Sequence, residues 1–238
     1  MRLLTATLLY LLSCTFDGML TAQEKPNEYN FSYLTINNGL CDNSIRAIHK
    51  DKNSFMWFGT SNGLDRYDGY DLKHYSAGSV YPHQFIESNY IYDIKEDDFQ
   101  NLWVGSDAGI FRINLPQENI EFLKGYDGAN KEILSTPVQS IYIDEFQNLW
   151  IGTNDCLAYV MLDRERSIKE IVILKRGVDV NTFIRHGNDI WVGGKNLLLR
   201  YNSTSRERYH QIPYTTSLDF SHLTINALFS FGDYLWIG

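Results

Sequence analysis

The stretch Trp57-Phe58-Gly59-Thr60 recurs along the chain at nearly even intervals. The other copies are Trp103-Val104-Gly105-Ser106, Trp150-Ile151-Gly152-Thr153, Trp191-Val192-Gly193-Gly194 and Trp236-Ile237-Gly238. Successive Trp residues lie 46, 47, 41 and 45 positions apart, and the copies use all five Trp residues of the chain. Internal repetition at a period of about 20 to 50 residues is the signature of repeat architectures, so this unit decides the fold.

The repeat continues upstream of each Trp. Two apolar residues three positions apart precede a turn, and in the first three copies an Asp stands six residues before the Trp, as Asp51, Asp97 and Asp144. In the fourth and fifth copies His186 and Phe231 take that place, and the turn is one residue shorter. The apolar runs are short, rich in β-branched and aromatic residues, and bounded by turn residues, which favours strands over helices. Four short strands in about 45 residues make one β-propeller blade, so the sequence predicts an all-β propeller with four blades plus half of a fifth.

Each recurring position of the unit has a physical role. The Trp is expected to fill the space between adjacent blades, and the Gly two residues later is expected to allow a neighbouring sheet to approach closely. The Asp is expected to accept backbone N–H groups and hold the hairpin turn. Gly63 and Gly109, six residues after their Trp, should supply a positive φ in the next turn. Cys156 and Leu197 occupy that position in the third and fourth copies, where we expect Asn154 or Asn196 to take the left-handed conformation.

Residues 1–22 have the features of an export signal. Arg2 precedes an apolar run from Leu3 to Leu12, and Ala22 is a suitable cleavage position before Gln23. A buried N-terminal helix is disfavoured, because Asp17 and Gly18 interrupt the run. A second interpretation is lipidation at Cys14, since Leu11-Leu12-Ser13-Cys14 weakly matches a lipobox.

Composition excludes several classes of protein. The net charge of −8 argues against a broad nucleic-acid-binding surface, which needs clustered Lys and Arg. After residue 22 no apolar stretch reaches the roughly 18 to 20 residues that span a bilayer. Three Cys are too few for a disulfide scaffold, and the separation of Cys41 from Cys156 does not argue for a bond between them.

No catalytic or cofactor pattern is present in the sequence. The six His residues form no zinc-type spacing with one another or with Cys, and no phosphate-binding glycine loop or nucleophile elbow occurs. We therefore expect no enzyme activity, no metal and no cofactor. Sialidase-like and quinone-dependent propellers also repeat Trp motifs, but the first needs a central Arg cluster that is not evident here, and the second has a different blade signature.

A family resemblance rests on the first repeat and the residues before it. Phe31-Ser32-Tyr33-Leu34-Thr35, Asn38-Gly39-Leu40, Asn43-Ser44-Ile45-Arg46-Ala47-Ile48 and the stretch from Trp57 to Tyr70, which ends in Asp68-Gly69-Tyr70, carry it. They resemble the periplasmic sensor region of hybrid two-component regulators, which is built on two-component regulator propeller repeats. Cys41 stands where this family usually has Ser, and Cys156 where it usually has Gly.

The resemblance implies a domain plan and a function. Residues 23–42 would be an N-terminal arm whose Phe31 to Thr35 strand closes a propeller, and residues 43–238 would be blades of a seven-bladed propeller. The end at Trp236-Ile237-Gly238, in the middle of a repeat, predicts a fragment of it. Such proteins detect oligosaccharides in the periplasm, act as homodimers, and signal by phosphorelay to a histidine kinase beyond a downstream membrane helix. The alternative is a stand-alone exported propeller that serves as a binding or scaffold module.

Ligand contacts are expected outside the repeated positions. Asp65-Arg66-Tyr67-Asp68 is a tempting polar cluster, but Arg66 recurs as Arg112 and Arg200 and is therefore better explained as scaffold. The non-repeating segments are residues 77–88, 125–137 and 209–221. They contain our candidate ligand-binding residues, His83, Gln84, Tyr126, Asp127 and Tyr214.

Overall fold

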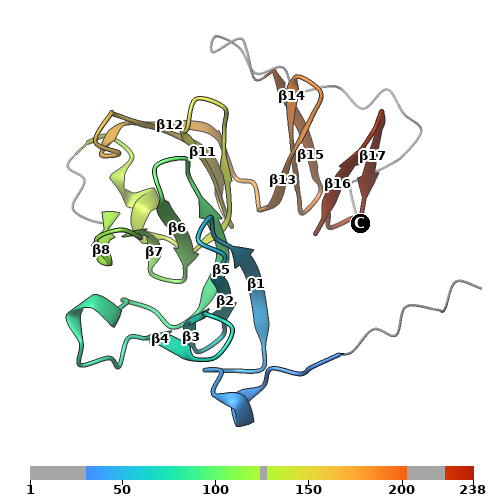
Figure 1. The fold of residues 1–238 in the computed structure, drawn as a ribbon. Helices are drawn as coiled ribbons and strands as arrows, with labels where there is room; N and C mark the ends of the chain where they lie inside the picture. Colours follow the sequence, from blue (N-terminus) through green and yellow to red (C-terminus); the bar gives the residue numbers. More distant parts are fainter. Residues whose placement is uncertain (1–30, 124–127, 203–222) are drawn as a thin grey trace, which may run out of the picture. The chain divides into compact units, whose positions relative to one another are not determined.

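The computed structural model describes residues 31–123, 128–202 and 223–238 (Figure 1). The chain divides into two compact units, Met1–Tyr33 and Leu34–Gly238, and every strand of the described ranges belongs to the second. The same ranges contain no α-helix, only short 3-10 turns: η1 (Ile36–Asn38), η2 (Pro82–Gln84) and η4 (Lys131–Ser135).

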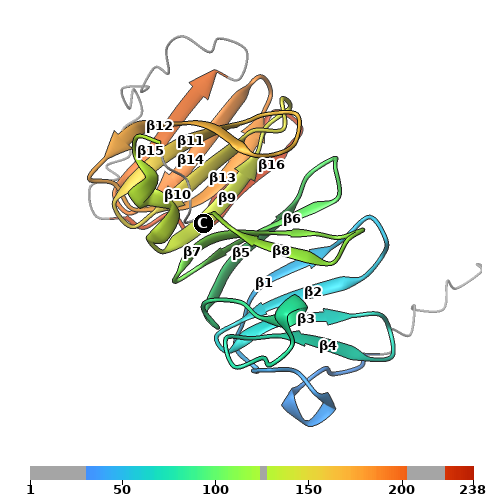
Figure 2. The same cartoon turned by 90° about the vertical axis from the view of Figure 1, so that its left-hand side faces the viewer.

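The strands form successive antiparallel sheets in which each strand pairs with the next along the chain (Figure 2). The first sheet consists of β1 (Ile45–Lys50), β2 (Met56–Thr60), β3 (Gly63–Tyr67) and β4 (Leu72–Tyr75). The second consists of β5 (Ile91–Glu96), β6 (Asn101–Ser106), β7 (Gly109–Asn114) and β8 (Asn119–Phe122). The third consists of β9 (Val138–Ile143), β10 (Leu149–Thr153), β11 (Cys156–Leu162) and β12 (Ile168–Arg176). The fourth consists of β13 (Val180–His186), β14 (Asp189–Gly194) and β15 (Leu197–Asn202), and the fifth of β16 (Leu228–Phe231) and β17 (Tyr234–Ile237).

This architecture confirms the predicted all-β propeller arrangement, with four blades and a smaller fifth sheet. The expected strand at Leu72 to Tyr75 is β4, whereas the one expected at Glu121 to Leu123 begins two residues earlier, as β8. Residues 31–35 form no strand, and the side chains of Phe31 and Tyr33 are exposed. The role of this segment in closing a propeller stays a prediction.

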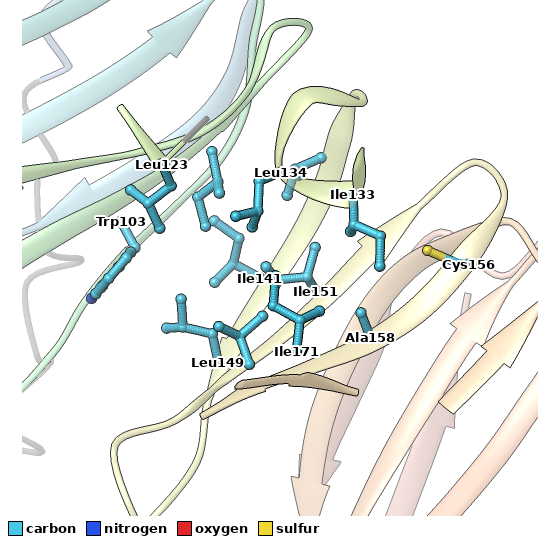
Figure 3. Packing of buried hydrophobic residues seen from close by; sticks show 13 residues of the cluster. Trp103, Leu123, Ile133, Leu134, Ile141, Leu149, Ile151, Cys156, Ala158 and Ile171 are labelled. Carbon is cyan, nitrogen blue, oxygen red and sulfur yellow. The ribbon is translucent and has the colours of Figure 1, made fainter. Parts of the chain in front are cut away.

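The Trp of the repeat lies between adjacent blades, as expected. Trp57 packs in a buried cluster with Ile91 and Ile94 of β5, the next blade. Trp103 likewise packs with Ile141 and Leu149 of the third blade, in the cluster drawn in Figure 3. Trp150 packs in the same way with Val180 of the fourth blade, so the first three Trp residues of the repeat each join their own blade to the following one through apolar burial.

The Asp of the repeat holds both the turn and the Trp. Asp51 Oδ1 accepts the backbone N–H groups of Asn53 and Phe55, each at 2.9 Å, as predicted. Its other oxygen accepts the indole N–H of Trp57 at 2.8 Å, a contact that the sequence analysis did not foresee. The same indole–carboxylate bond joins Trp103 to Asp97 at 3.0 Å and Trp150 to Asp144 at 3.4 Å. The fourth blade lacks this Asp, and there Trp191 Nε1 is buried with no hydrogen-bond partner among the described residues.

The turns after the Trp-x-Gly strand partly match expectation. Gly63 and Gly109 adopt positive φ angles of 137° and 108°, and Asn196 takes the left-handed conformation at 53°. The expectation for Asn154 is wrong, because this residue has no positive φ. The turn is closed instead by Thr153 Oγ1, which accepts the backbone N–H of Cys156 at 2.8 Å and that of Asp155 at 3.1 Å.

The Gly of the repeat lies where the next blade approaches most closely. A Cβ atom on Gly105 would lie 2.5 Å from the carbonyl oxygen of Val138, the first residue of β9. We therefore expect Gly105→Ala to lower the free energy of unfolding by about 1–3 kcal/mol through overpacking. Gly78 is the control, because a Cβ there meets nothing within 4 Å, and Gly78→Ala should change stability by less than about 0.5 kcal/mol. Urea unfolding measures both, and equal midpoints for the two variants would contradict the close-approach explanation.

Candidate functional site

The first strand of each of the four blades carries a β-bulge at the same point of the repeat. In β1, β5, β9 and β13 the pairing with the next strand skips one residue near the start of the strand. The skipped residues are Arg46, Tyr92, Gln139 and Asn181. Each lies eleven residues before its Trp, or ten in the fourth copy. Bulges redirect the side chain of the unpaired residue and are over-represented near functional sites.

These four side chains line one cavity, which we name the bulge pocket. Its volume is ≈ 460 Å³, and Ser44 and Ile45 complete its lining. The pocket lies within the range of about 300–1,000 Å³ that is typical of small-molecule sites. Four successive blades thus each contribute one polar side chain from an equivalent backbone position.

Arg46 is held over aromatic rings at this pocket. Its guanidinium carbon lies 4.3 Å from the centroid of the Tyr90 ring and 5.8 Å from that of Tyr92. The two Tyr rings contact each other at 4.9 Å, and Arg46 Nε donates to Ser61 Oγ at 3.4 Å. Stacking of this kind orders the guanidinium while leaving other N–H donors in its fixed fork.

The other pocket residues supply a neutral hydroxyl and two amides. Tyr92 Oη donates to Asp107 Oδ1 at 2.8 Å, and burial, reinforced by this hydrogen bond, raises the pKa of Tyr92 to about 12. Asn181 Nδ2 donates to the carbonyl oxygen of Ile225 at 3.2 Å. Gln139 Oε1 is buried and has no hydrogen-bond partner among the described residues. A buried polar atom without a partner costs free energy, and a ligand donor could satisfy it.

Contacts between blades fix the backbone around the bulges. Asp93 Oδ2 accepts the backbone N–H of Ile141 at 2.8 Å, which links the second blade to the third. Ser140 Oγ donates to the carbonyl oxygen of Val180 at 3.1 Å, which links the third to the fourth. The bulged residues therefore project from a backbone that neighbouring blades hold in place, the arrangement that a precise binding site needs.

The candidate residues predicted from the sequence lie elsewhere. His83 and Gln84 form part of η2, in the connection between β4 and β5, where His83 is exposed and Gln84 is half-buried. Neither lines the bulge pocket. Tyr126, Asp127 and Tyr214 lie outside the described residues. Ligand binding by these five residues stays a prediction.

The sequence analysis missed the bulge position because it searched only the non-repeating segments. A usable signal was present, since the residue eleven before the Trp, or ten before it in the fourth copy, is polar in every full copy but differs in type from copy to copy. A position whose backbone place is the same in every blade, while its side chain differs from blade to blade, is suited to recognising a ligand. Nothing in the apolar pattern alone indicates a bulge there.

The Arg of the repeat behaves as scaffold. Arg66 lies over the rings of Phe55 and Trp57, at 4.7 and 5.9 Å, and pairs with Glu118. Arg112 and Arg200 lie over Trp103 and Trp191 in the same way, at 5.8 and 5.7 Å. The recurring Arg therefore covers the recurring Trp of its own blade.

A second cavity of ≈ 320 Å³ lies beside Trp103, lined in part by Arg112 and Arg166. Both guanidinium groups are already paired, Arg112 with Glu121 and Arg166 with Asp97.

The blades and their buried Trp residues define a β-propeller, and comparison with known proteins specifies its repeat. Residues 39–62, 86–108 and 132–155 match the family described as Two component regulator propeller. These segments hold the first three Trp-x-Gly copies, so the chain carries two-component regulator propeller repeats, as the resemblance implied.

Solved structures with the same fold include regulators and enzymes. The extracellular domain of a protein described as a hybrid two component system from B. thetaiotaomicron superimposes with a TM-score of 0.68 at 18% identity, over 87% of this chain and 29% of that one. Virginiamycin B lyase from Staphylococcus aureus superimposes with a TM-score of 0.58 at 18% identity, over 84% of this chain and 64% of that one. At these identities the likeness shows the fold alone, and the chain spans less than two thirds of either protein. No curated protein sequence matches this chain.

Within the described residues, no helix is long and apolar enough to cross a membrane.

Proposed function

We propose that this chain is part of the periplasmic sensor of a hybrid two-component regulator, and that its propeller binds an oligosaccharide in the bulge pocket. The two-component regulator propeller repeats support the class of protein. The observation that carries the binding proposal is the set of four different polar residues at one repeated bulge, around one cavity.

The chemistry of the bulge pocket suits a sugar. Each sugar hydroxyl can both donate and accept a hydrogen bond, so a site needs donors and acceptors in close succession. Arg46 and Asn181 supply donors, and Gln139 Oε1 supplies a buried acceptor that has no hydrogen-bond partner in the described part of the chain. The ring of Tyr92 supplies apolar surface for the C–H face of a pyranose. Among the described residues that line the bulge pocket there is no carboxylate, so these residues do not specifically select cations.

The wider proposals follow from the family resemblance. The complete protein would be exported by residues 1–22, anchored in the inner membrane by a downstream helix, and active as a homodimer that signals to its histidine kinase. Residues 1–22 lie outside the described part of the chain.

An oligosaccharide array tests the proposal. We expect the purified chain to bind one structural class of oligosaccharide. Arg46→Ala should weaken that binding at least tenfold, because it removes the one cationic donor among the described residues that line the bulge pocket. His83→Ala is the matched control, since His83 is an exposed candidate outside this pocket. Loss of binding in His83→Ala with full binding in Arg46→Ala would move the site to the connection between β4 and β5. Absence of binding to every sugar on the array would favour the scaffold alternative.

A further inference from the structure

Three side chains with metal-ligating atoms lie together at the outer strands of the first blade. They are Cys41, which follows η1, Asp65 of β3 and His74 of β4. We propose that these residues form a binding site for a single zinc ion. This site is separate from the bulge pocket, and none of its residues lines that pocket.

The fold brings the three residues together from distant positions in the sequence. Asp65 and His74 face each other directly in the β3–β4 ladder, and directly paired strand residues place their side chains on the same face. Cys41 is held beside Asp65 by a hydrogen bond, in which its backbone N–H donates to Asp65 Oδ2 at 2.8 Å. No sequence spacing typical of zinc sites exists here, which explains why the pattern of Cys and His predicted no metal.

The distances are close to those that zinc requires. The Cys41 thiol lies 2.9 Å from Asp65 Oδ1, His74 Nδ1 lies 2.6 Å from the same oxygen, and Sγ lies 3.4 Å from Nδ1. In a tetrahedral site with Zn–S of about 2.3 Å and Zn–N or Zn–O of about 2.1 Å, ligand atoms lie about 3.4–3.6 Å apart. The sulfur–nitrogen distance already fits, and the two distances to Asp65 need to widen by under about 1 Å. The His74 side chain is 46% exposed and can make that movement.

The charges at the site favour a cation. The Asp65 side chain is fully buried, and within the described ranges its one ion-pair partner is His74, which is charged only when protonated. A buried carboxylate is stable only when it is paired or coordinates a metal. The Cys41 N–H bond to Oδ2 orients the carboxylate and leaves Oδ1 to face the sulfur and the imidazole, as an outer-sphere partner does in metal sites.

The same geometry argues against a nucleophilic cysteine. Burial, followed by the hydrogen bond and the charge of Asp65, raises the pKa of Cys41 to about 12, whereas reactive thiols have a lowered pKa. Cys41 and Asp65 also approach the same imidazole nitrogen, so His74 cannot relay a proton between them.

The ligand set selects the type of metal. One thiolate, one imidazole and one carboxylate suit Zn²⁺, whereas Ca²⁺ and Mg²⁺ prefer oxygen ligands alone. On binding, the S–H bond breaks, its proton passes to solvent, and a sulfur–zinc bond forms. Three protein ligands leave the fourth position of a tetrahedral zinc site open to water.

Zinc titration of the untagged, chelator-stripped full chain tests the proposal. We expect one Zn²⁺ per chain by calorimetry and elemental analysis, and a higher Tm in its presence. Cobalt substitution should give a thiolate-to-metal charge-transfer band, which requires sulfur as a ligand. Cys41→Ser and His74→Ala should each weaken binding at least tenfold, and Cys41→Ser should abolish the band.

Three control variants keep the test specific. Cys14→Ser and Cys156→Ser remove the other thiols, and His83→Ala removes an exposed imidazole, so all three should bind zinc like the native chain. His74→Ala alters only a partly exposed side chain, so it tests the site even if Asp65→Asn fails to fold. Absence of saturable zinc binding in the native chain would overturn the proposal. So would zinc binding by Cys41→Ser and His74→Ala that is as tight as binding by the native chain.

Discussion

Asp97→Ala is expected to lower the free energy of unfolding by about 3–5 kcal/mol, because it leaves a buried charge without its partner. Arg166 Nε donates to Asp97 Oδ2 at 3.0 Å, and both side chains are buried. The pair joins the second blade to the third, since Asp97 follows β5 and Arg166 lies between β11 and β12. The variant also removes the acceptor of the Trp103 indole N–H.

The neighbouring Asp98 gives a matched control. Its side chain is 71% exposed and pairs with Lys52 at 2.9 Å, so Asp98→Ala should cost no more than about 1 kcal/mol. Replacing both members of the buried pair, as Asp97→Leu with Arg166→Met, should recover much of the loss. Urea unfolding measures all three variants. Equal destabilisation by Asp97→Ala and Asp98→Ala would contradict the role of the buried pair.

The pair also predicts how stability depends on pH. Burial raises the pKa of the Asp97 carboxyl, but hydrogen bonds from Asn101 and Trp103 and the charge of Arg166 outweigh it, so the net pKa is lowered. A carboxyl whose pKa is lower when folded contributes stability that is complete above its unfolded pKa of about 3.9. That contribution is lost as the pH falls through the folded value. The difference in free energy of unfolding between the native chain and Asp97→Asn should therefore become smaller at acid pH. A difference that does not change with pH would contradict the lowered pKa of Asp97.

Trp57→Ala is expected to cost about 3–5 kcal/mol, because it opens a cavity between the first two blades. The Trp57 side chain is fully buried, packs with Ile91 and Ile94, and donates to Asp51. Trp236 occupies the same place in the repeat but is 63% exposed, so Trp236→Ala is a control of identical chemistry. It should change stability by about 0.5 kcal/mol or less.

Chemical unfolding of the two Trp variants distinguishes a stabilising effect of Trp burial between blades from an effect of the repeated motif within its own hairpin. We expect a large fall in the midpoint for Trp57→Ala and almost none for Trp236→Ala. Similar losses in both would show that the motif acts through its own hairpin and not through contact between blades.

The repeat predicted the fold well because each of its positions acts locally. The Asp holds a turn within its own blade, the Trp and the Gly set the contact with the next blade, and successive copies repeat these contacts. Asn154 shows where local reasoning failed, since the Thr153 hydroxyl closes that turn without a positive φ.

The candidate sites were harder to predict because they depend on register and on distant contacts. A bulge such as that at Gln139 is a shift of one residue in strand pairing, which the apolar pattern does not record. The cluster of Cys41, Asp65 and His74 depends on the β3–β4 register and on the path of the segment before β1. The spacing of apolar residues does not show the bulge, and the spacing of Cys and His does not show the cluster.

The most direct test of the sensor account is a crystal structure of this chain with the oligosaccharide that binds best on the array. We predict that sugar hydroxyls lie within hydrogen-bond distance of Gln139 Oε1 and Arg46, with a sugar ring against Tyr92. A sugar bound at residues 77–88, with the bulge pocket filled by water alone, would contradict the account.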